Sequence, residues 1–493
     1  MIQYSTRFYL IALFVLLYII SPAQLFTPFV KTLKDTASFH LIPPYDEAKP
    51  PLTITGEQAL QDISMLEYII NNAFAGRDYW QSNGLDFPSM YKSLRKLVTG
   101  NTTVATGNIE DTIYHYLSLI NDAHTHVTGF KNREMVRNLR PYYSEIVVEK
   151  RGNTYIVVNS ADARVKKGAR YLGPVSGLFR TLSAPGITQY LVGQQSVVPI
   201  EKMKVSFNSG STVLTLHPSK MGDIRFADAE SLYEMDTAAA IPVIRSSSFS
   251  HSQNQKSLTD FINSGKLLSQ KKAFIWNIID NRGGDGYFPT AFIQAFNGTS
   301  YENVTTLTLY SPVINQCYWP GRNSWIHWDA LSMKGLKDEL FPLDSIPAGK
   351  REKIRRMRQD KKTVQNHPEK LWEVEPAKAA VKGTYEGKVI VLVNHLTNSA
   401  ANNAVAMAKN LKNALIVGEN TGSAYTFANV KYYALEHSRI KLWLPSVLLL
   451  NPDNRMEKGF EPDYWLDTAD PVSEVRRWLA SPSSYQFSYT GPN

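Results

Sequence analysis

The chain has 493 residues, of which 43% are apolar and 11% aromatic, which is enough to bury the cores of two or three domains and excludes extensive disorder. Its formal net charge is +9, but the basic residues concentrate in one stretch, residues 334–370, and do not spread along a face, so we do not expect a nucleic-acid partner. The single cysteine, Cys317, excludes an intramolecular disulfide framework.

Residues 1–23 have the pattern of a secretory signal peptide. Arg7 precedes an apolar run from Phe8 to Ile20, and the small residues Ser21 and Ala23 suit a cleavage site. An uncleaved membrane anchor is the alternative, but this run is shorter than the roughly 20 residues needed to span a bilayer. We therefore expect an exported protein, periplasmic or extracellular in a bacterium, with membrane contact only through an uncleaved anchor.

Three patterns follow one another along the rest of the chain. Apolar residues at spacings of three and four predict a helical N-terminal domain over residues 24–135. Short alternating runs between glycine and proline turns predict a small β-rich domain over residues 136–235. Apolar strands that alternate with helical patterns predict an α/β core over residues 236–480. Within it, the basic stretch 334–370 is typical of a solvated helical insertion, with a lid or a surface for anionic envelope components as the alternative.

Residues 389–422 predict a strand, a loop, a helix and a second strand. Branched apolar residues form the first strand, Val389–Val393, and a second apolar strand runs from Ala414 to Val417. Small residues at helical spacing follow Ser399, which lies in the loop between the first strand and the helix. In a βαβ unit such a loop lies at the carboxyl end of its strand, where functional residues are common. Ser399 is therefore a candidate nucleophile.

A glycine-rich turn offers donors for an oxyanion. Residues 273–296 predict a strand that ends at Asp280 and is followed by Gly283 and Gly284 before a helix begins. Glycines allow backbone amides to approach a substrate and to stabilise a developing negative charge. A tight turn without a catalytic role would give the same pattern.

Two histidines are candidate bases for a serine nucleophile. His124 and His126 follow Asp122 just after a predicted helix ends. A neutral imidazole can take the serine proton and return it to a leaving amine. The same three residues also form a short cluster of a metal-binding type, and a histidine that only terminates a helix is the remaining alternative.

Taken together, these segments resemble the tail-specific, or carboxyl-terminal processing, serine peptidases and the tricorn-like and retinoid-binding-protein-like branches of the same superfamily. The family elements are a DGHT-like turn, a strand similar to IDLRxNxGG, a VLVNxxSASASE…GExTxG segment and a closing GxxPD strand. The residues that match them in chain order are Asp122–Thr125, Ile279–Gly284, Val391–Gly422 and Arg455–Leu466. Ala123 and Asn402 stand where the pattern has glycine and glutamate.

The resemblance implies a ClpP/crotonase-like spiral αβ core with Ser399 as the nucleophile. It also implies an oxyanion hole formed by the backbone amide of Ala400 and that of Gly283 or Gly284. The β-rich domain stands in the place of a PDZ-like peptide-binding module, although it lacks a clear carboxylate-binding loop.

The resemblance further divides the family by its base. In the processing peptidases a lysine follows the last glycine of GExTxG, whereas here Ser423 stands at that position. The tricorn-like branch takes a histidine from an earlier segment, which implies His124 as the base and His126 as the alternative. Glu457 or Glu461, in the closing strand, would complete the relay.

We therefore expect a serine peptidase that acts on peptides or protein tails and needs neither a metal nor a cofactor. Two alternatives stay open at this point. One is a catalytically silent protein on the same fold that binds an apolar ligand or a peptide. The other is a metal-dependent hydrolase that uses Asp122, His124 and His126. The sequence does not predict the oligomeric state.

Overall fold

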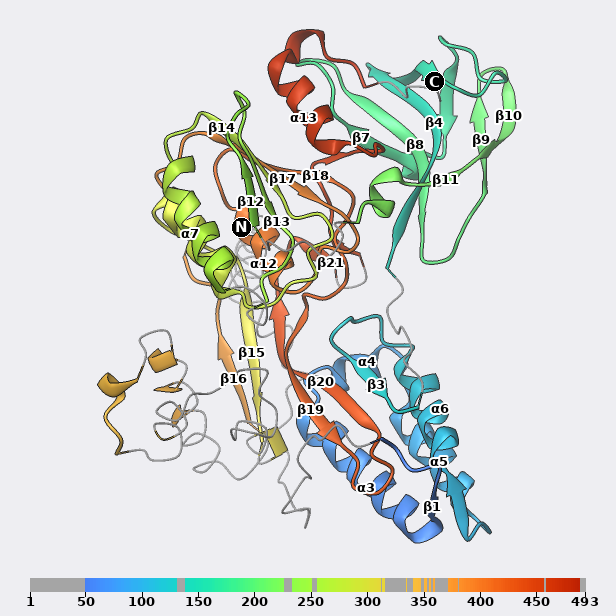
Figure 1. The fold of residues 1–493 in the computed structure, drawn as a ribbon. Helices are drawn as coiled ribbons and strands as arrows, with labels where there is room; N and C mark the ends of the chain where they lie inside the picture. Colours follow the sequence, from blue (N-terminus) through green and yellow to red (C-terminus); the bar gives the residue numbers. More distant parts are fainter. Residues whose placement is uncertain are drawn as a thin grey trace, which may run out of the picture. The chain divides into compact units, whose positions relative to one another are not determined.

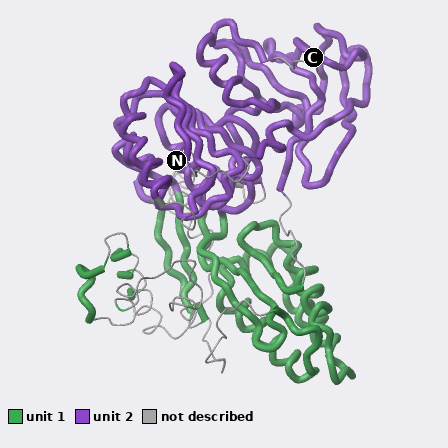
Figure 2. The backbone as a smooth tube through the Cα atoms, viewed as in Figure 1, with its two compact units in different colours: residues 1–136, 304–377, 426–450 green, residues 137–303, 378–425, 451–493 purple. Residues whose placement is uncertain are grey.

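The described part of the chain forms two compact units (Figure 2). The computed structural model describes residues 49–130, 138–225, 233–250, 255–311, 313–314, 334, 340–346, 350–352, 354–355, 358–359, 371–379, 381–455 and 458–487. Unit 1 comprises residues 1–136, 304–377 and 426–450, and unit 2 comprises residues 137–303, 378–425 and 451–493. The domain boundaries expected at residues 135 and 235 stay predictions.

Three expectations from the sequence concern residues outside the described ranges. The signal peptide, Cys317 and most of the charged insertion 334–370 lie outside the described residues. Of the insertion, the described parts include the short helix η4 (Leu343–Ser345) and a small apolar cluster in which Ile346 and Ile354 are buried. Within the described ranges, no helix combines the length and the apolar character needed to cross a membrane.

Unit 1 begins with the expected helical segment. Its elements are β1 (Thr53–Thr55), α3 (Gly56–Ala73), α4 (Arg77–Ser82), α5 (Phe87–Val98), β2 (Thr103–Ala105) and α6 (Thr106–Leu117). Thr55 begins α3 with a capping box, because its side chain accepts a hydrogen bond from Gln58 N and the Gln58 side chain accepts one from Thr55 N. Ala59, Ile63, Leu66, Ile69 and Ile70 of α3 are buried, as the sequence pattern predicts, whereas Leu60 is 44% exposed.

A five-stranded antiparallel sheet completes unit 1 and positions the segment with the two histidines. Its strand order is β16 (Leu371–Glu375), β15 (Thr305–Tyr310), β20 (Lys441–Leu450) and β19 (Phe427–Ala434), and β3 (His126–Thr128) pairs with β20. His126 lies opposite Trp443 in this pairing. The histidines are therefore held by strands that come from the far end of the sequence.

Unit 2 contains a 14-stranded sheet that includes a run of adjacent parallel strands (Figure 1). The parallel strands are β13 (Val243–Ser246), β14 (Ala273–Asn277), β17 (Lys388–Val393), β18 (Ala414–Gly418) and β23 (Tyr464–Trp465), with β12 (Tyr233–Asp236) antiparallel at the edge. The helices of this part are α7 (Gln255–Leu268), α8 (Tyr287–Asn297), α12 (Ala400–Ala408) and α13 (Pro471–Ala480). The strands expected at 389–393 and 414–417 and the helix after Ser399 are confirmed.

The β-rich region extends the same sheet and does not form a sheet of its own. Its elements are β4 (Arg140–Arg151), β5 (Thr154–Ser160), β6 (Arg170–Gly173), η2 (Val175–Gly177), β7 (Leu178–Thr181), β8 (Gln189–Ser196), β9 (Lys202–Phe207), β10 (Gly210–Thr215), β11 (His217–Pro218) and η3 (Lys220–Asp223). Thr181 of β7 pairs with Trp465 of β23, and the Thr181 hydroxyl donates to Trp465 O at 2.7 Å. The remaining short elements are β21 (Asn454–Arg455), β22 (Gly459–Phe460) and η5 (Pro482–Ser484).

The core of unit 2 explains why β17 is an unbroken apolar run. Five of its six residues are buried, because a parallel strand in the middle of a sheet is covered on both faces. Ile390 and Leu392 share one apolar cluster with Trp465 and with Trp478 of α13. The expected class, an α/β core with a β-rich region and N-terminal helices, is confirmed.

This packing predicts that Ile390→Ala destabilises unit 2. Ile390 is 0% exposed, so the truncation leaves a cavity under the central strand and should lower the free energy of unfolding by about 2–5 kcal/mol. The control is Leu267→Ala on α7, where the side chain is 63% exposed and the change should stay within about 0.5 kcal/mol. Urea unfolding of both variants measures the difference, and equal midpoints would contradict the assigned core.

Candidate active site

Ser399 has an unusual backbone conformation at the first turn of a helix. Its φ is 55° and its ψ is −120°, and α12 begins at the next residue. Holding a residue other than glycine in such a conformation costs about 1–3 kcal/mol of free energy. The conformation therefore persists only where the surrounding structure imposes it. The half-buried Ser399 is therefore held by specific contacts that we describe next.

Hydrogen bonds fix the backbone of Ser399 on both sides. Ser399 N donates to Ala424 O at 2.8 Å, and Ser399 O accepts from Asn402 N at 2.8 Å and from Asn403 N at 3.2 Å. Asn398 N, one residue earlier, donates to Asn281 O at 3.0 Å. The turn is thus tied to the segment after β18 and to the segment after β14.

The loop that leads to Ser399 is anchored by side chains at the ends of the strands. Asn394 Oδ1 accepts from Asp280 N and from Leu396 N, both at 3.1 Å. Thr397 Oγ1 donates to Ile278 O at 3.0 Å. Since β14 and β17 are adjacent and parallel, these bonds join their carboxyl ends.

The glycine pair lies directly against Ser399. Gly283 has a φ of 97°, and a Cβ on it would lie 2.6 Å from Ser399 Cβ and 2.8 Å from Ala400 N. Gly284 has a φ of 135°, and a Cβ there would lie 2.2 Å from the carbonyl carbon of Phe249. Both positions therefore exclude a side chain, and the backbone of this turn packs directly against the Ser399 turn and against Phe249.

The amides of the two glycines differ in their partners. Gly283 N donates to Asn281 Oδ1 at 2.8 Å. Among the described residues, no hydrogen bond is donated by the amides of Gly284 or Ala400. Ala400 is the first residue of α12, where backbone N–H groups lack helical partners and carry the positive end of the helix dipole.

His124 lies in unit 1 and makes a hydrogen bond that sets its tautomer. Its Nδ1 donates to the backbone carbonyl oxygen of Phe427, the first residue of β19. In the neutral ring this leaves Nε2 as the acceptor nitrogen. Burial lowers the pKa of His124 below the usual histidine value, with the hydrogen bond to Phe427 O as a smaller opposing influence. The imidazole is therefore neutral at neutral pH.

His126 has a different environment. Its Nε2 donates to Ala123 O at 2.5 Å, and its ring packs edge-on against Trp443 at a centroid distance of 5.4 Å. Burial also lowers the pKa of this imidazole. The two imidazoles therefore differ in the nitrogen that donates to a backbone oxygen, which is Nδ1 in His124 and Nε2 in His126.

Asp122 is buried beside the two histidines and accepts a hydrogen bond from Thr125 Oγ1 at 2.8 Å. Burial raises its pKa to about 7, and the Thr125 hydroxyl partly offsets this shift. Across the described ranges, no three His, Cys, Asp or Glu side chains are grouped as metal ligands would be.

The structure describes one of the two candidate relay carboxylates, Glu461. Glu457 lies outside the described residues. Glu461 is half-buried and follows Phe460, whose N and O exchange hydrogen bonds with the Thr421 side chain and backbone at 2.9 and 3.0 Å. The closing strand is therefore fastened to the GExTxG segment next to Glu461.

A buried imidazole–carboxylate pair was not predicted from the sequence. His395 Nδ1 lies 3.1 Å from Glu419 Oε2, and both side chains are at most 5% exposed. His395 follows β17 and Glu419 follows β18, so the pair joins the carboxyl ends of two adjacent parallel strands. That position in the βαβ unit was the available signal, because polar residues directly after neighbouring parallel strands meet at one edge of the sheet.

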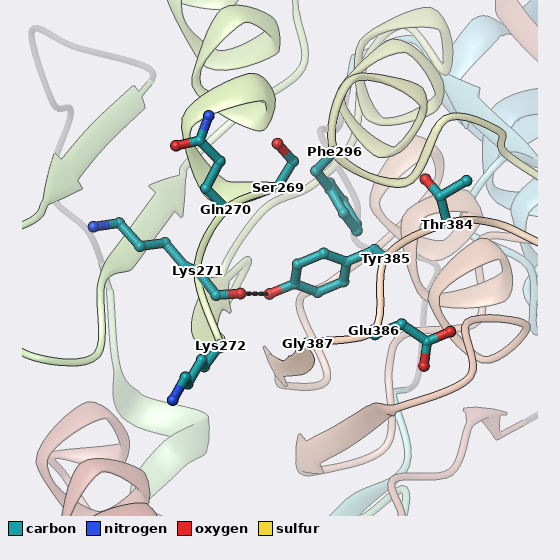
Figure 3. Close-up of a pocket in the computed structure, with 9 residues that line it drawn as sticks. All are labelled: Ser269, Gln270, Lys271, Lys272, Phe296, Thr384, Tyr385, Glu386 and Gly387. Atoms are coloured by element: carbon teal, nitrogen blue, oxygen red, sulfur yellow. Dashed lines mark hydrogen bonds between the residues drawn. The ribbon is translucent and has the colours of Figure 1, made fainter.

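A separate pocket lies at the amino ends of β14 and β17, whereas the candidate nucleophile and the glycine pair follow the carboxyl ends of these strands (Figure 3). It has a volume of about 580 Å³ and is lined by residues 269–272, which precede β14, by 384–387, which precede β17, and by Phe296. Tyr385 donates its hydroxyl to Lys271 O at 2.8 Å within it. Ligands of open α/β sheets bind at the carboxyl ends of strands, and this pocket contains none of the candidate site residues.

Comparison with known proteins gives a family match. Residues 240–466, a little under half of the chain, match the model of peptidase family S41, and the chain is similar to this family of tail-specific peptidases. The protein is a serine-type peptidase, and its substrates are peptides or proteins. No curated protein matched the sequence.

Several solved structures are similar to the chain at low identity. Mature CPAF in complex with lactacystin is 14% identical, with 87% of this chain and 99% of that chain covered and a TM-score of 0.45. The photosystem II D1 C-terminal processing protease is 12% identical, with coverages of 87% and 97% and a TM-score of 0.37. The tricorn protease is 13% identical, with coverages of 86% and 36% and a TM-score of 0.37. The likeness to peptidase family S41 rests on the match over residues 240–466.

The glycine packing predicts that Gly283→Ala disrupts the turn at Ser399. The new methyl group would overlap Ser399 Cβ. The alanine backbone would also have to adopt a φ of 97°, which is unfavourable for a residue with a Cβ. We expect at least a tenfold lower rate of Ser399 modification by a serine-directed phosphonate, measured on folded protein. Gly286→Ala is the matched control, because the nearest atom to its Cβ would be the Asn403 side-chain nitrogen at 3.3 Å. Equal rates in both variants would argue against the close approach.

The raised pKa of Asp122 predicts a pH-dependent contribution to stability. Between the ordinary pKa near 4 and about 7 the folded state binds more protons than the unfolded state, so this contribution is lost as pH rises through that window. The difference in free energy of unfolding between wild type and Asp122→Asn should fall from pH 4 to 7 and then stay constant. Urea unfolding at a series of pH values measures it, and a difference that rises with pH would contradict the assignment.

Proposed function

We propose that the protein is an exported serine peptidase of the Ser/His type, with Ser399 as nucleophile and His124 as general base. The observation that carries the proposal is the strained turn at Ser399, which lies against Gly283 and begins a helix. Strained turns of this kind cluster at functional sites, where they expose a reacting group in a fixed orientation. Ser399 belongs to unit 2 and His124 to unit 1, so their pairing rests on the family resemblance and not on a measured distance.

The chemistry follows from the groups named. His124 Nε2 takes the proton of the Ser399 hydroxyl as Oγ attacks the scissile carbonyl carbon, and the protonated imidazole then gives that proton to the leaving amine. Water, activated by the same imidazole, hydrolyses the resulting acyl-enzyme. We assign the oxyanion hole to the amides of Ala400 and Gly284, since the Gly283 amide already donates to Asn281.

The orientation of His124 differs from that in a simple Ser–His–carboxylate relay. Its Nδ1 donates to a backbone oxygen, that of Phe427, which performs the orienting role that a carboxylate performs elsewhere. Glu461 therefore acts, in this proposal, by stabilising the imidazolium at a distance, and Glu457 is the alternative. Truncating Glu461 should then cost less activity than truncating His124.

Labelling of Ser399 tests the proposal directly. We expect a broad serine-directed phosphonate to modify Ser399, as located by mass spectrometry, and Ser399→Ala to abolish the adduct. His124→Ala should lower the labelling rate at least a hundredfold, within the range that general bases contribute. His126→Ala is the control and should keep the rate within a few fold. A folded protein that gives no adduct would overturn the peptidase site and favour a silent binding protein.

The pH dependence of labelling tests the base. Because burial lowers the pKa of His124, the neutral imidazole persists below the usual histidine range. The rate should rise with pH through a midpoint below 6.5 and should level off above it. His124→Ala should remove this limb of the profile. A midpoint above 7 would identify a different base.

Export has its own test. The apolar run Phe8–Ile20 and the small residues before residue 24 lead us to propose cleavage after Ala23. Intact-mass measurement of the protein recovered from its native compartment should then show a chain that begins at Gln24. A chain that keeps residues 1–23 and fractionates with membranes would support the uncleaved anchor.

A further inference from the structure

Asn402 is a fully buried polar residue in the first turn of α12. Its exposed fraction is 0%, and its side-chain Nδ2 donates to two backbone oxygens, Gly422 O at 3.0 Å and Ala424 O at 3.2 Å. Ala424 O is also the acceptor for Ser399 N at 2.8 Å. One carbonyl oxygen therefore receives both the nucleophile's backbone N–H and the Asn402 amide.

A second asparagine acts on the same short segment. Asn398 Oδ1 accepts a hydrogen bond from Ala424 N at 3.2 Å, and Gly422 N donates to Thr397 O at 3.0 Å. We call Asn398 and Asn402, which flank Ser399, the asparagine bracket. The bracket holds residues 422–424 against the turn through both the N–H and the C=O of Ala424.

The chemistry of the side chain at position 402 is determined by its partners. Both are carbonyl oxygens, so the group that faces them must be a donor, and a carboxylate, which only accepts, cannot replace it. The Asn402 Oδ1 atom is buried and has no hydrogen-bond partner among the described residues. An unpaired buried acceptor is unfavourable, so the stabilising contribution of this side chain comes from its two donated bonds.

We propose that Asn402 is a positioning residue for the nucleophile. Its amide fixes Ala424 O, and this oxygen in turn holds Ser399 N and with it the positive φ of the serine. Asn402 itself does not contact the substrate or the reacting atoms. The inference rests on the proposed role of Ser399 as nucleophile, and it assigns to a neutral amide the position at which the resembled family pattern has a glutamate.

Asn402→Asp separates this role from general stability. The aspartate has almost the same shape, but its ionised form cannot donate and places a negative charge beside two carbonyl oxygens. Burial and these oxygens both raise the pKa of the new carboxyl group, and its neutral form can restore one donated bond. The ratio of the variant's Ser399 labelling rate to that of wild type should therefore be about 0.1 or lower at pH 8 and should rise as the pH falls toward 5.

The experiment measures phosphonate labelling of Ser399 in wild type, Asn402→Asp and Asn410→Asp between pH 5 and 8, with thermal unfolding recorded alongside. Asn410 is the matched control, because it is just past the other end of α12 and its Nδ2 also donates to a backbone oxygen, Ala406 O at 2.8 Å. The Asn410→Asp ratio should stay within about twofold of 1 and should not change with pH. Using ratios cancels the titration of His124, which all three proteins share.

Each outcome has a distinct meaning. If Asn402→Asp is folded and its ratio stays near 1 at every pH, the positioning role is wrong, while labelling of wild type still supports the nucleophile. If wild type itself is not labelled, the proposed function fails instead. If Asn402→Asp does not fold, Asn402→Ala decides, since alanine suits a helix: a low, pH-independent ratio supports the role and a ratio near 1 overturns it.

Discussion

The hydrogen bond from Ser399 N to Ala424 O is the interaction on which the candidate active site depends. A φ of 55° is unfavourable for a serine, and the hydrogen bond to Ala424 O offsets this cost and holds Ser399 in that conformation. The bond requires the segment after β18 to lie beside the loop after β17. That condition is met only because the two strands are adjacent and parallel.

The same edge of the sheet supplies the other parts of the site in unit 2. The turn after β14 brings Gly283 against Ser399, the loop after β17 contains the serine, and the segment after β18 contains Glu419 and Ala424. In a parallel sheet every strand runs in the same direction, because each connection carries the chain back to the side of the sheet where the strands begin. The loops that follow the strands therefore meet at the carboxyl ends, even when they come from distant parts of the sequence. The buried His395–Glu419 pair and the asparagine bracket are further products of this convergence.

Unit 1 contributes the proposed base by a different route. His124 follows a helix near the start of the chain, yet its ring is oriented by Phe427, more than 300 residues later in sequence. The pairing of β3 with β20 holds His126 against Trp443 and gives it an environment that differs from that of His124. In the proposed function, His124 is the base because its Nδ1 donates to Phe427 O, whereas in His126 the donor is Nε2.

The sequence by itself determined the α/β class, the strand, loop and helix around Ser399, and the resemblance to tail-specific peptidases that follows from motifs in chain order. These depend on local periodicity and on residue types at short spacing, which a linear pattern records. Tertiary structure alone decided that the β-rich region continues the central sheet through β7 and β23, which tautomer His124 adopts, and why position 402 is a donor. Each of these depends on a contact between residues far apart in the chain, and a pattern of neighbours does not specify which distant carbonyl a side chain will meet.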